Sequence, residues 1–174
     1  MGVTGKIDFN IRVTDANTTD LGTDVQNHLL ELAKTYSDGA TTGLINEVWS
    51  ETYTTVAAAF TNLDFTNMPA ATGDPRGAGV SFSKVKGIFI KKSTPTDYLK
   101  YGGGTNCGAA VDAFAGVDDY PLADDSDLGQ IVGSNGLMVW VNEDGATVGA
   151  GTAVLGVGAV TTDQTWSIVV IGIS

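Results

Sequence analysis

Apolar and polar residues alternate with a period of two near the start of the chain. From Lys6 to Thr14, every second residue is apolar and the residues between them are polar or charged. The apolar positions are Ile7, Phe9, Ile11 and Val13. This alternation predicts a β-strand with one buried face and one solvated face.

Three further long runs also predict strands. Glu47 to Val56 is rich in Thr, Trp, Tyr and Val, which suit a pleated surface, although neither of its faces is purely apolar. Phe82 to Lys92 and Thr165 to Ile173 carry apolar residues on both faces, so both faces of each are expected to be buried. Shorter strands are predicted at Leu63–Phe65, Tyr98–Tyr101, Leu137–Val141 and Ala153–Val157. Turn residues surround Leu137–Val141, with Asn135-Gly136 before it and Asn142 to Gly145 after it.

One segment fits two kinds of element. Val25 to Tyr36 places Val25, Leu29, Leu32 and Tyr36 on one side of a helix, with Asp24 as a possible cap, but it also fits a strand. Met68 to Gly79 has no consistent period and predicts a loop. Many short strands separated by Gly, Asn and Asp predict an all-β protein, an antiparallel jelly-roll-like β-sandwich with at most one short helix. We expect one domain over residues 1–174, with an N-terminal strand or arm over about residues 1–45.

Composition excludes several classes of function. A formal net charge of -11 argues against binding nucleic acid, which requires clustered Lys and Arg. No apolar run approaches the length of a membrane span. The single Cys107 cannot form an intrachain disulfide, and the first residues lack the pattern of a secretory signal, so assembly in a reducing cytoplasm is expected.

Several segments of the chain stand in a characteristic order and spacing. They are Val48-Trp49-Ser50, Tyr53-Thr54, Asn62-Leu63-Asp64-Phe65, the run from Phe82 to Ile90, Gly102-Gly103-Gly104, the run from Gly136 to Asn142, and the run from Trp166 to Ser174. Over residues 46–174 the chain resembles a family of tailed-bacteriophage virion proteins with jelly-roll folds, found as head decoration or cement proteins. The chain departs from that pattern at Val25 to Tyr36 and in the acidic segment Asp118 to Asp127. The resemblance implies a subunit that binds the major capsid protein on the outside of the capsid and stabilises the head, commonly as a homotrimer.

Residues that could carry chemistry are few. His28 is the only histidine available as a general base, and we expect no catalytic residue, no enzymatic activity and no cofactor. Asp124, Asp125 and Asp127 are a weak calcium candidate, because they copy only part of the EF-hand spacing; a solvated acidic loop is the alternative. Trp49, Trp140 and Trp166 could form a sugar platform if exposed, but their strand patterns favour packing in the core.

The basic residues suggest where a partner could bind. Five lysines form the basic concentration of this acidic chain and are interface candidates: Lys84, Lys86, Lys91, Lys92 and Lys100. The alternative is that they are solvated strand edges that discourage aggregation. The sequence therefore favours a non-enzymatic capsid decoration subunit. A tail or fibre component that binds a receptor or glycan is the second hypothesis, and a small glycan-active enzyme is the third.

Overall fold

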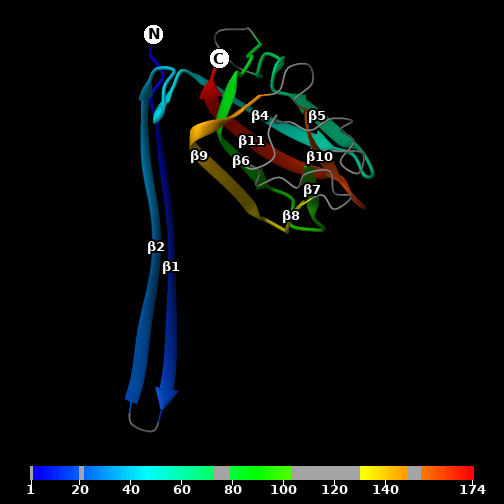
Figure 1. The fold of residues 1–174 in the computed structure, drawn as a ribbon. Helices are drawn as coiled ribbons and strands as arrows, with labels where there is room; N and C mark the ends of the chain where they lie inside the picture. Colours follow the sequence, from blue (N-terminus) through cyan, green and yellow to red (C-terminus); the bar gives the residue numbers. More distant parts are fainter. Residues whose placement is uncertain (1, 20–21, 73–78, 103–129, 149–153) are drawn as a thin grey trace.

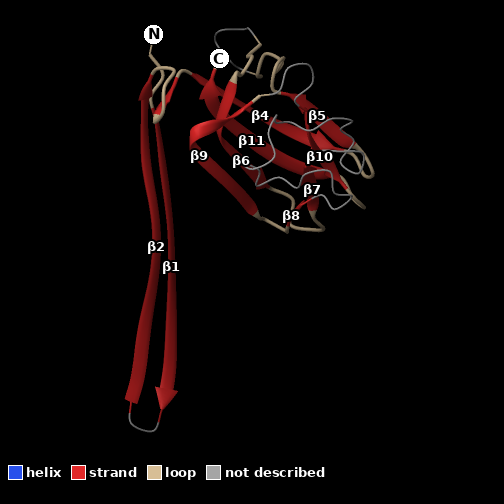
Figure 2. Cartoon of the chain, viewed as in Figure 1, coloured by secondary structure: helices blue, strands red, loops and turns tan. Residues whose placement is uncertain are grey.

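The protein is an all-β structure with no helix in the residues that the structure describes. The computed structural model describes residues 2–19, 22–72, 79–102, 130–148 and 154–174. The strands are β1 (Gly5–Thr19), β2 (Gly22–Asp38), β3 (Leu44–Ile45), β4 (Glu47–Thr55), β5 (Phe60–Asp64), β6 (Lys84–Lys92), β7 (Leu99–Gly102), β8 (Gln130–Val132), β9 (Leu137–Thr147), β10 (Val154–Ala159) and β11 (Gln164–Ile173). Figure 2 shows that the strands form two parts, a long hairpin of β1 and β2 and a broader body.

The N-terminal part is a long two-stranded arm. Strands β1 and β2 pair antiparallel without a register break, from Gly5 opposite Tyr36 to Thr19 opposite Gly22. Figure 1 shows this hairpin projecting away from the rest of the chain. Strand β2 contains all of Val25–Tyr36, so the choice between helix and strand is settled in favour of strand. The physical reason is the ladder with β1, which supplies backbone hydrogen-bond partners that a local pattern cannot reveal.

The body of the protein is a sandwich of two antiparallel four-stranded sheets. One sheet has the strand order β4-β11-β6-β9 and the other has the order β5-β10-β7-β8. Side chains from both sheets meet in one apolar core, which includes Trp49, Leu63, Ile88, Ile90, Leu99, Leu155, Val157, Trp166, Ile168 and Val170. Burial of these side chains is the main driving force for pairing the two sheets.

The central strands β6 and β11 have apolar residues on both faces, as the sequence predicts. Ile88 and Ile168 point into the sandwich core, whereas Phe89 and Ile171 lie on the outer face of the sheet. The base of the arm covers part of that outer face. The prediction that both faces are buried is therefore confirmed near the arm, whereas Val169 on the same face is 36% exposed.

Strand β9 is longer than the sequence predicts. The residues from Asn142 to Gly145 continue the strand instead of closing it as a turn. The ladder between β6 and β9 shifts register here, because Val85 pairs with Ala146 while Gly87 pairs with Val141. The turn-forming residues therefore form a bulge, where Gly145 has a φ of 80°. Strands β3 and β8 were not predicted, because runs of two and three residues give no periodic signal.

Candidate interaction site at the base of the arm

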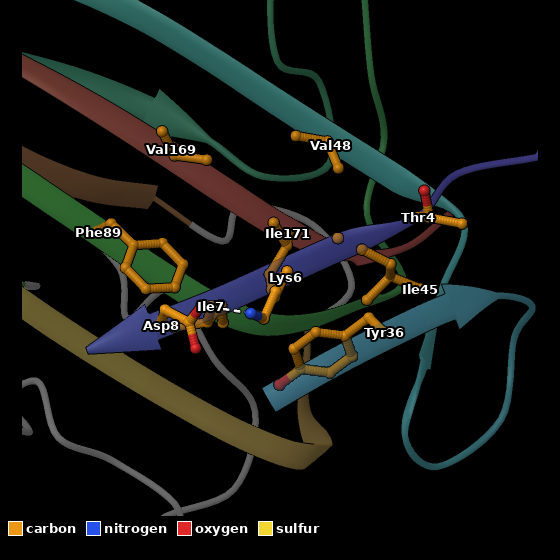
Figure 3. Close-up of a pocket in the computed structure, with 11 residues that line it drawn as sticks. Thr4, Lys6, Ile7, Asp8, Tyr36, Ile45, Val48, Phe89, Val169 and Ile171 are labelled. Atoms are coloured by element: carbon orange, nitrogen blue, oxygen red, sulfur yellow. Dashed lines mark ion pairs between the residues drawn. The ribbon is translucent and has the colours of Figure 1, made fainter. Parts of the chain in front are cut away.

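A cavity lies where the arm meets the outer face of the β4-β11-β6-β9 sheet. Its volume is about 380 Å³, and Figure 3 shows β1 crossing in front of strands from that sheet. The apolar lining comes from both parts of the chain: Ile7, Ile45, Val48, Phe89, Val169 and Ile171. Lys6 and Asp8 of β1 also line the cavity, and their side chains form an ion pair with 2.5 Å between nitrogen and oxygen. The walls are thus apolar and the rim is charged.

A second, smaller apolar cluster holds the arm to the sandwich. Its buried members are Tyr36 of the arm, Ile45 of β3 and Ile171 of β11. Partly buried apolar side chains pack around them, namely Val3, Ile7, Val48, Phe89 and Val141. Ile7 of the β1 alternation therefore faces the sheet, while Lys6 and Asp8 on either side of it are exposed.

Polar contacts reinforce this junction. The Lys86 ammonium donates a hydrogen bond of 2.6 Å to the carbonyl oxygen of Thr41, in the segment between the arm and β3. Lys34 of the arm pairs with Glu143 of β9 at 2.5 Å. The Thr42 hydroxyl donates to the Asp144 carboxylate at 3.0 Å. The bulge of β9 therefore fixes the segment that carries the arm.

Burial of Lys86 has an electrostatic cost. Its side chain has no exposed surface. Loss of solvent lowers the pKa of Lys86, and the positive charge of Lys84 lowers it further. The carboxylates of Asp144 and Glu143 oppose that shift. The acidic bulge and the Thr41 carbonyl thus provide the charge and the hydrogen bond that a buried ammonium requires.

Tyr36 is the unusual residue of the junction. It is fully buried, and its hydroxyl has no hydrogen-bond partner among the described residues. Burial raises the pKa of this hydroxyl, and the negative charge of Glu143 adds to the effect. The Lys34 ammonium lies 5.9 Å from the centre of the Tyr36 ring. The ring is therefore well accommodated, while the hydroxyl is not.

Replacing Tyr36 by Phe is expected to stabilise the protein. Tyr36→Phe removes an unpaired buried hydroxyl, whose desolvation costs about 1–3 kcal/mol, and keeps the ring. A raised folded-state pKa gives stability that is present below the ordinary pKa of 10.0 and lost as the pH rises above it. The advantage of the variant should therefore grow above about pH 10. Urea unfolding at neutral and alkaline pH measures both effects, and a loss of stability at neutral pH would contradict the expectation.

The five interface lysines do not lie together. Lys86 and Lys92 are fully buried, and the Lys92 ammonium donates hydrogen bonds to the carbonyl oxygens of Thr94 and Thr96. This corrects the expectation for these two lysines, which cannot belong to an exposed docking surface. Lys84 and Lys91 are exposed near opposite ends of β6, and Lys100 lies on β7 in the other sheet. Sequence reasoning missed the burial because the hydrogen-bond acceptors lie in loops.

The tryptophans belong to the core. Trp49 and Trp166 are 1% and 0% exposed, and half-buried Trp140 packs against the same core. Packing, the alternative favoured from the sequence, is confirmed for the first two. The indole N–H of Trp49 donates to the carbonyl oxygen of Pro69 at 2.8 Å. A sugar platform built on Trp49 and Trp166 is therefore excluded in this fold.

Of the other residues considered as sites, the structure describes only the backbone of His28. Cys107 and the calcium candidates Asp124, Asp125 and Asp127 are outside the described residues. His28 lies on β2, and its backbone pairs with Val13. Among the described residues, no group of three or more His, Cys, Asp or Glu side chains could hold a metal ion.

Comparisons with known proteins found no relative of this chain. No protein-family model, curated protein or solved structure matches the chain. The described part of the chain contains no helix long and apolar enough to cross a membrane.

Proposed function

We propose that this chain is a structural subunit of a tailed-bacteriophage particle, a decoration protein that binds the outside of the capsid and reinforces it. The sequence resemblance to jelly-roll cement proteins suggests this role and a trimeric state. In this proposal the protein works by contact and catalyses no reaction. Its binding elements are the arm and the sheet surface at the base of the arm.

The strand order of the sandwich is the observation that carries the proposal. A jelly roll is an eight-stranded double sheet in which strands numbered along the chain are ordered 1-8-3-6 and 2-7-4-5. When the described strands from β4 to β11 are numbered in this way, their two sheets have the same order. We therefore infer a jelly roll, the architecture that the resemblance implies and one used by viral capsid proteins.

The arm supports a role in assembly. A two-stranded hairpin alone is marginally stable in water, yet β1 and β2 extend well beyond the sandwich (Figure 1). Among the described strands, the outer edge of β1 and that of β2 before Ser37 pair with no other strand, so they could join another sheet. An element of this kind gains its stability from a partner surface. A particle offers such surfaces many times over, both on capsid subunits and on neighbouring copies of this chain.

The proposal is tested by heating particles that carry the protein and particles stripped of it. A subunit that binds only the assembled shell stabilises it by mass action, so stripped particles should release their genomes at a lower temperature. Adding purified protein back should restore the higher release temperature. Release is followed with a dye that fluoresces on binding the freed DNA.

A variant with a disrupted fold serves as the control for the add-back. Such a protein should restore nothing. Equal release temperatures with and without native protein would overturn the cement role. Electron images that place the protein on tails would then favour the receptor-binding alternative.

A further inference from the structure

The apolar face of the arm contacts its own sandwich at the base. Ile7 and Phe9 are half-buried, while Asp8 and Asn10 between them are exposed. In the sequence the same alternation continues at Ile11 and Val13, and the ladder continues to Thr19. Fifteen residues at about 3.3 Å each make β1 about 50 Å long. The distal arm therefore needs an apolar surface from elsewhere.

The outer face of the β4-β11-β6-β9 sheet offers such a surface. Val169, Phe89 and Val139 stand opposite one another in a row across β11, β6 and β9. Val169 is 36% exposed, and the other two are half-buried. In a parallel row, Leu137 is 54% exposed opposite Lys91. We call these four apolar residues the outer patch: Leu137, Val139, Phe89 and Val169.

The chain already contains one example of how arm and sheet fit together. At its base, Ile7 of the arm packs in the same cluster as Ile171 and Phe89 of the sheet. The cavity of about 380 Å³ opens beside this contact, and Val169 lines it (Figure 3). The outer patch is therefore continuous, through Phe89, with an existing contact between arm and sheet, and Leu137 and Val169 are its exposed part.

Charge favours the same pairing. Between residues 11 and 31 the sequence has one basic residue, Arg12, and four acidic residues: Asp15, Asp20, Asp24 and Glu31. The exposed Lys91 lies beside the outer patch, next to Leu137 in the ladder. An acidic arm and a lysine at the edge of an apolar patch are complementary.

We propose that the arm of one copy lies across the outer patch of a neighbouring copy. Each chain carries both halves of this contact, so copies join head to tail and close into a ring when the rotation permits. The occupant of the patch is thus a second copy of this chain. This inference deepens the proposed function. It rests on that function only where it places the oligomer on a capsid.

Two charge substitutions test the two halves of the contact. Phe9→Asp alters the apolar face of the arm, and Val169→Glu alters the outer patch. Each should weaken self-association about 30-fold or more, the loss expected at the centre of an interface. Light scattering over a range of protein concentrations measures the mass. Circular dichroism confirms the fold, and Val169→Ser is a milder second variant if Val169→Glu does not fold.

Matched controls place the same charges elsewhere. Thr35→Asp adds a carboxylate on the exposed face of the arm, opposite Lys6 in the ladder, and Val56→Glu adds one at a residue that is 59% exposed outside the sheet. Both controls should associate like the parent protein. Lys91→Glu should weaken association, and the effect should shrink as salt is added.

A mixing experiment distinguishes arm exchange from other oligomers. Phe9→Asp keeps an intact patch and Val169→Glu keeps an intact arm, so an equal mixture should form pairs of one copy of each. A dimer built patch to patch would be insensitive to Phe9→Asp and would not recover on mixing. A monomeric parent protein, unchanged mass in either variant, or a mixture that stays monomeric with both variants folded would overturn the inference. The particle-heating experiment is independent, so it can fail or succeed separately.

Discussion

Truncating Trp166 to Ala is expected to lower the free energy of unfolding by about 3–5 kcal/mol. Trp166 lies on the inner face of β11 and is completely buried. Its indole N–H donates a hydrogen bond of 3.0 Å to the Thr55 hydroxyl, and its ring centre lies 4.9 Å from that of Tyr53. The substitution removes the largest kind of side chain from the core and leaves the Thr55 hydroxyl without this donor. Urea unfolding measures the change.

A substitution at an exposed apolar residue is the control for Trp166→Ala. Val56 is 59% exposed, so Val56→Ala should change the free energy of unfolding by no more than about 0.5 kcal/mol. The slope of unfolding against urea should remain the same in both variants, because the surface exposed on unfolding is similar. A loss below about 1 kcal/mol for Trp166→Ala would contradict the packing described for the core.

The sequence predicts those strands in which the positions of the apolar residues indicate which faces are buried. The alternation from Lys6 to Thr14 lies within β1, and the run from Phe82 to Lys92 contains β6. Both follow from a simple rule, that neighbouring side chains in a strand point to opposite faces. Sheet order does not follow from that rule. The neighbours of β11 are β4 and β6, which are far from it in the chain, and only the packing of the whole sandwich selects them.

One choice that the sequence leaves open and one wrong prediction share one physical origin. The segment Val25–Tyr36 fits a helix and a strand equally well as an isolated pattern, and the partner that decides the matter is β1. The turn-forming residues at Asn142 to Gly145 are likewise accommodated in a bulge because β6 supplies a partner on that side. Local propensity is weak where a tertiary contact provides backbone hydrogen bonds.

The interaction site could be predicted only in part. The excess of apolar residues on both faces of β6 and β11 correctly indicated a second covered surface. Nothing in the sequence indicated that the cover is the base of the arm. The lysines show the same limit, because Lys84 and Lys86 occupy the same strand with similar neighbours, and only one ammonium reaches a carbonyl acceptor in the Thr41 segment.

Truncating Lys86 is expected to destabilise the junction between arm and sandwich. Lys86→Ala removes three buried methylene groups, worth about 0.8 kcal/mol each, and a hydrogen bond from a charged donor, worth about 1.5–3 kcal/mol. The variant no longer has to bury an ammonium, and the desolvation cost that it avoids offsets part of that loss. A net decrease of about 2–4 kcal/mol in the free energy of unfolding is expected by urea unfolding.

The same variant should loosen the segment that carries the arm. Three backbone amides there are hydrogen-bonded, Gly39 to Ile45, Gly43 to Glu143 and Leu44 to Thr41, and they should exchange hydrogen faster in Lys86→Ala. Lys86→Met keeps most of the buried stem and should lose mainly the contribution of the hydrogen bond. Lys84→Ala, at the exposed end of β6, should change stability by no more than about 0.5 kcal/mol. If Lys84→Ala cost as much as Lys86→Ala, or if exchange in the segment stayed at the parent rate, the ammonium would not be what holds the arm in place.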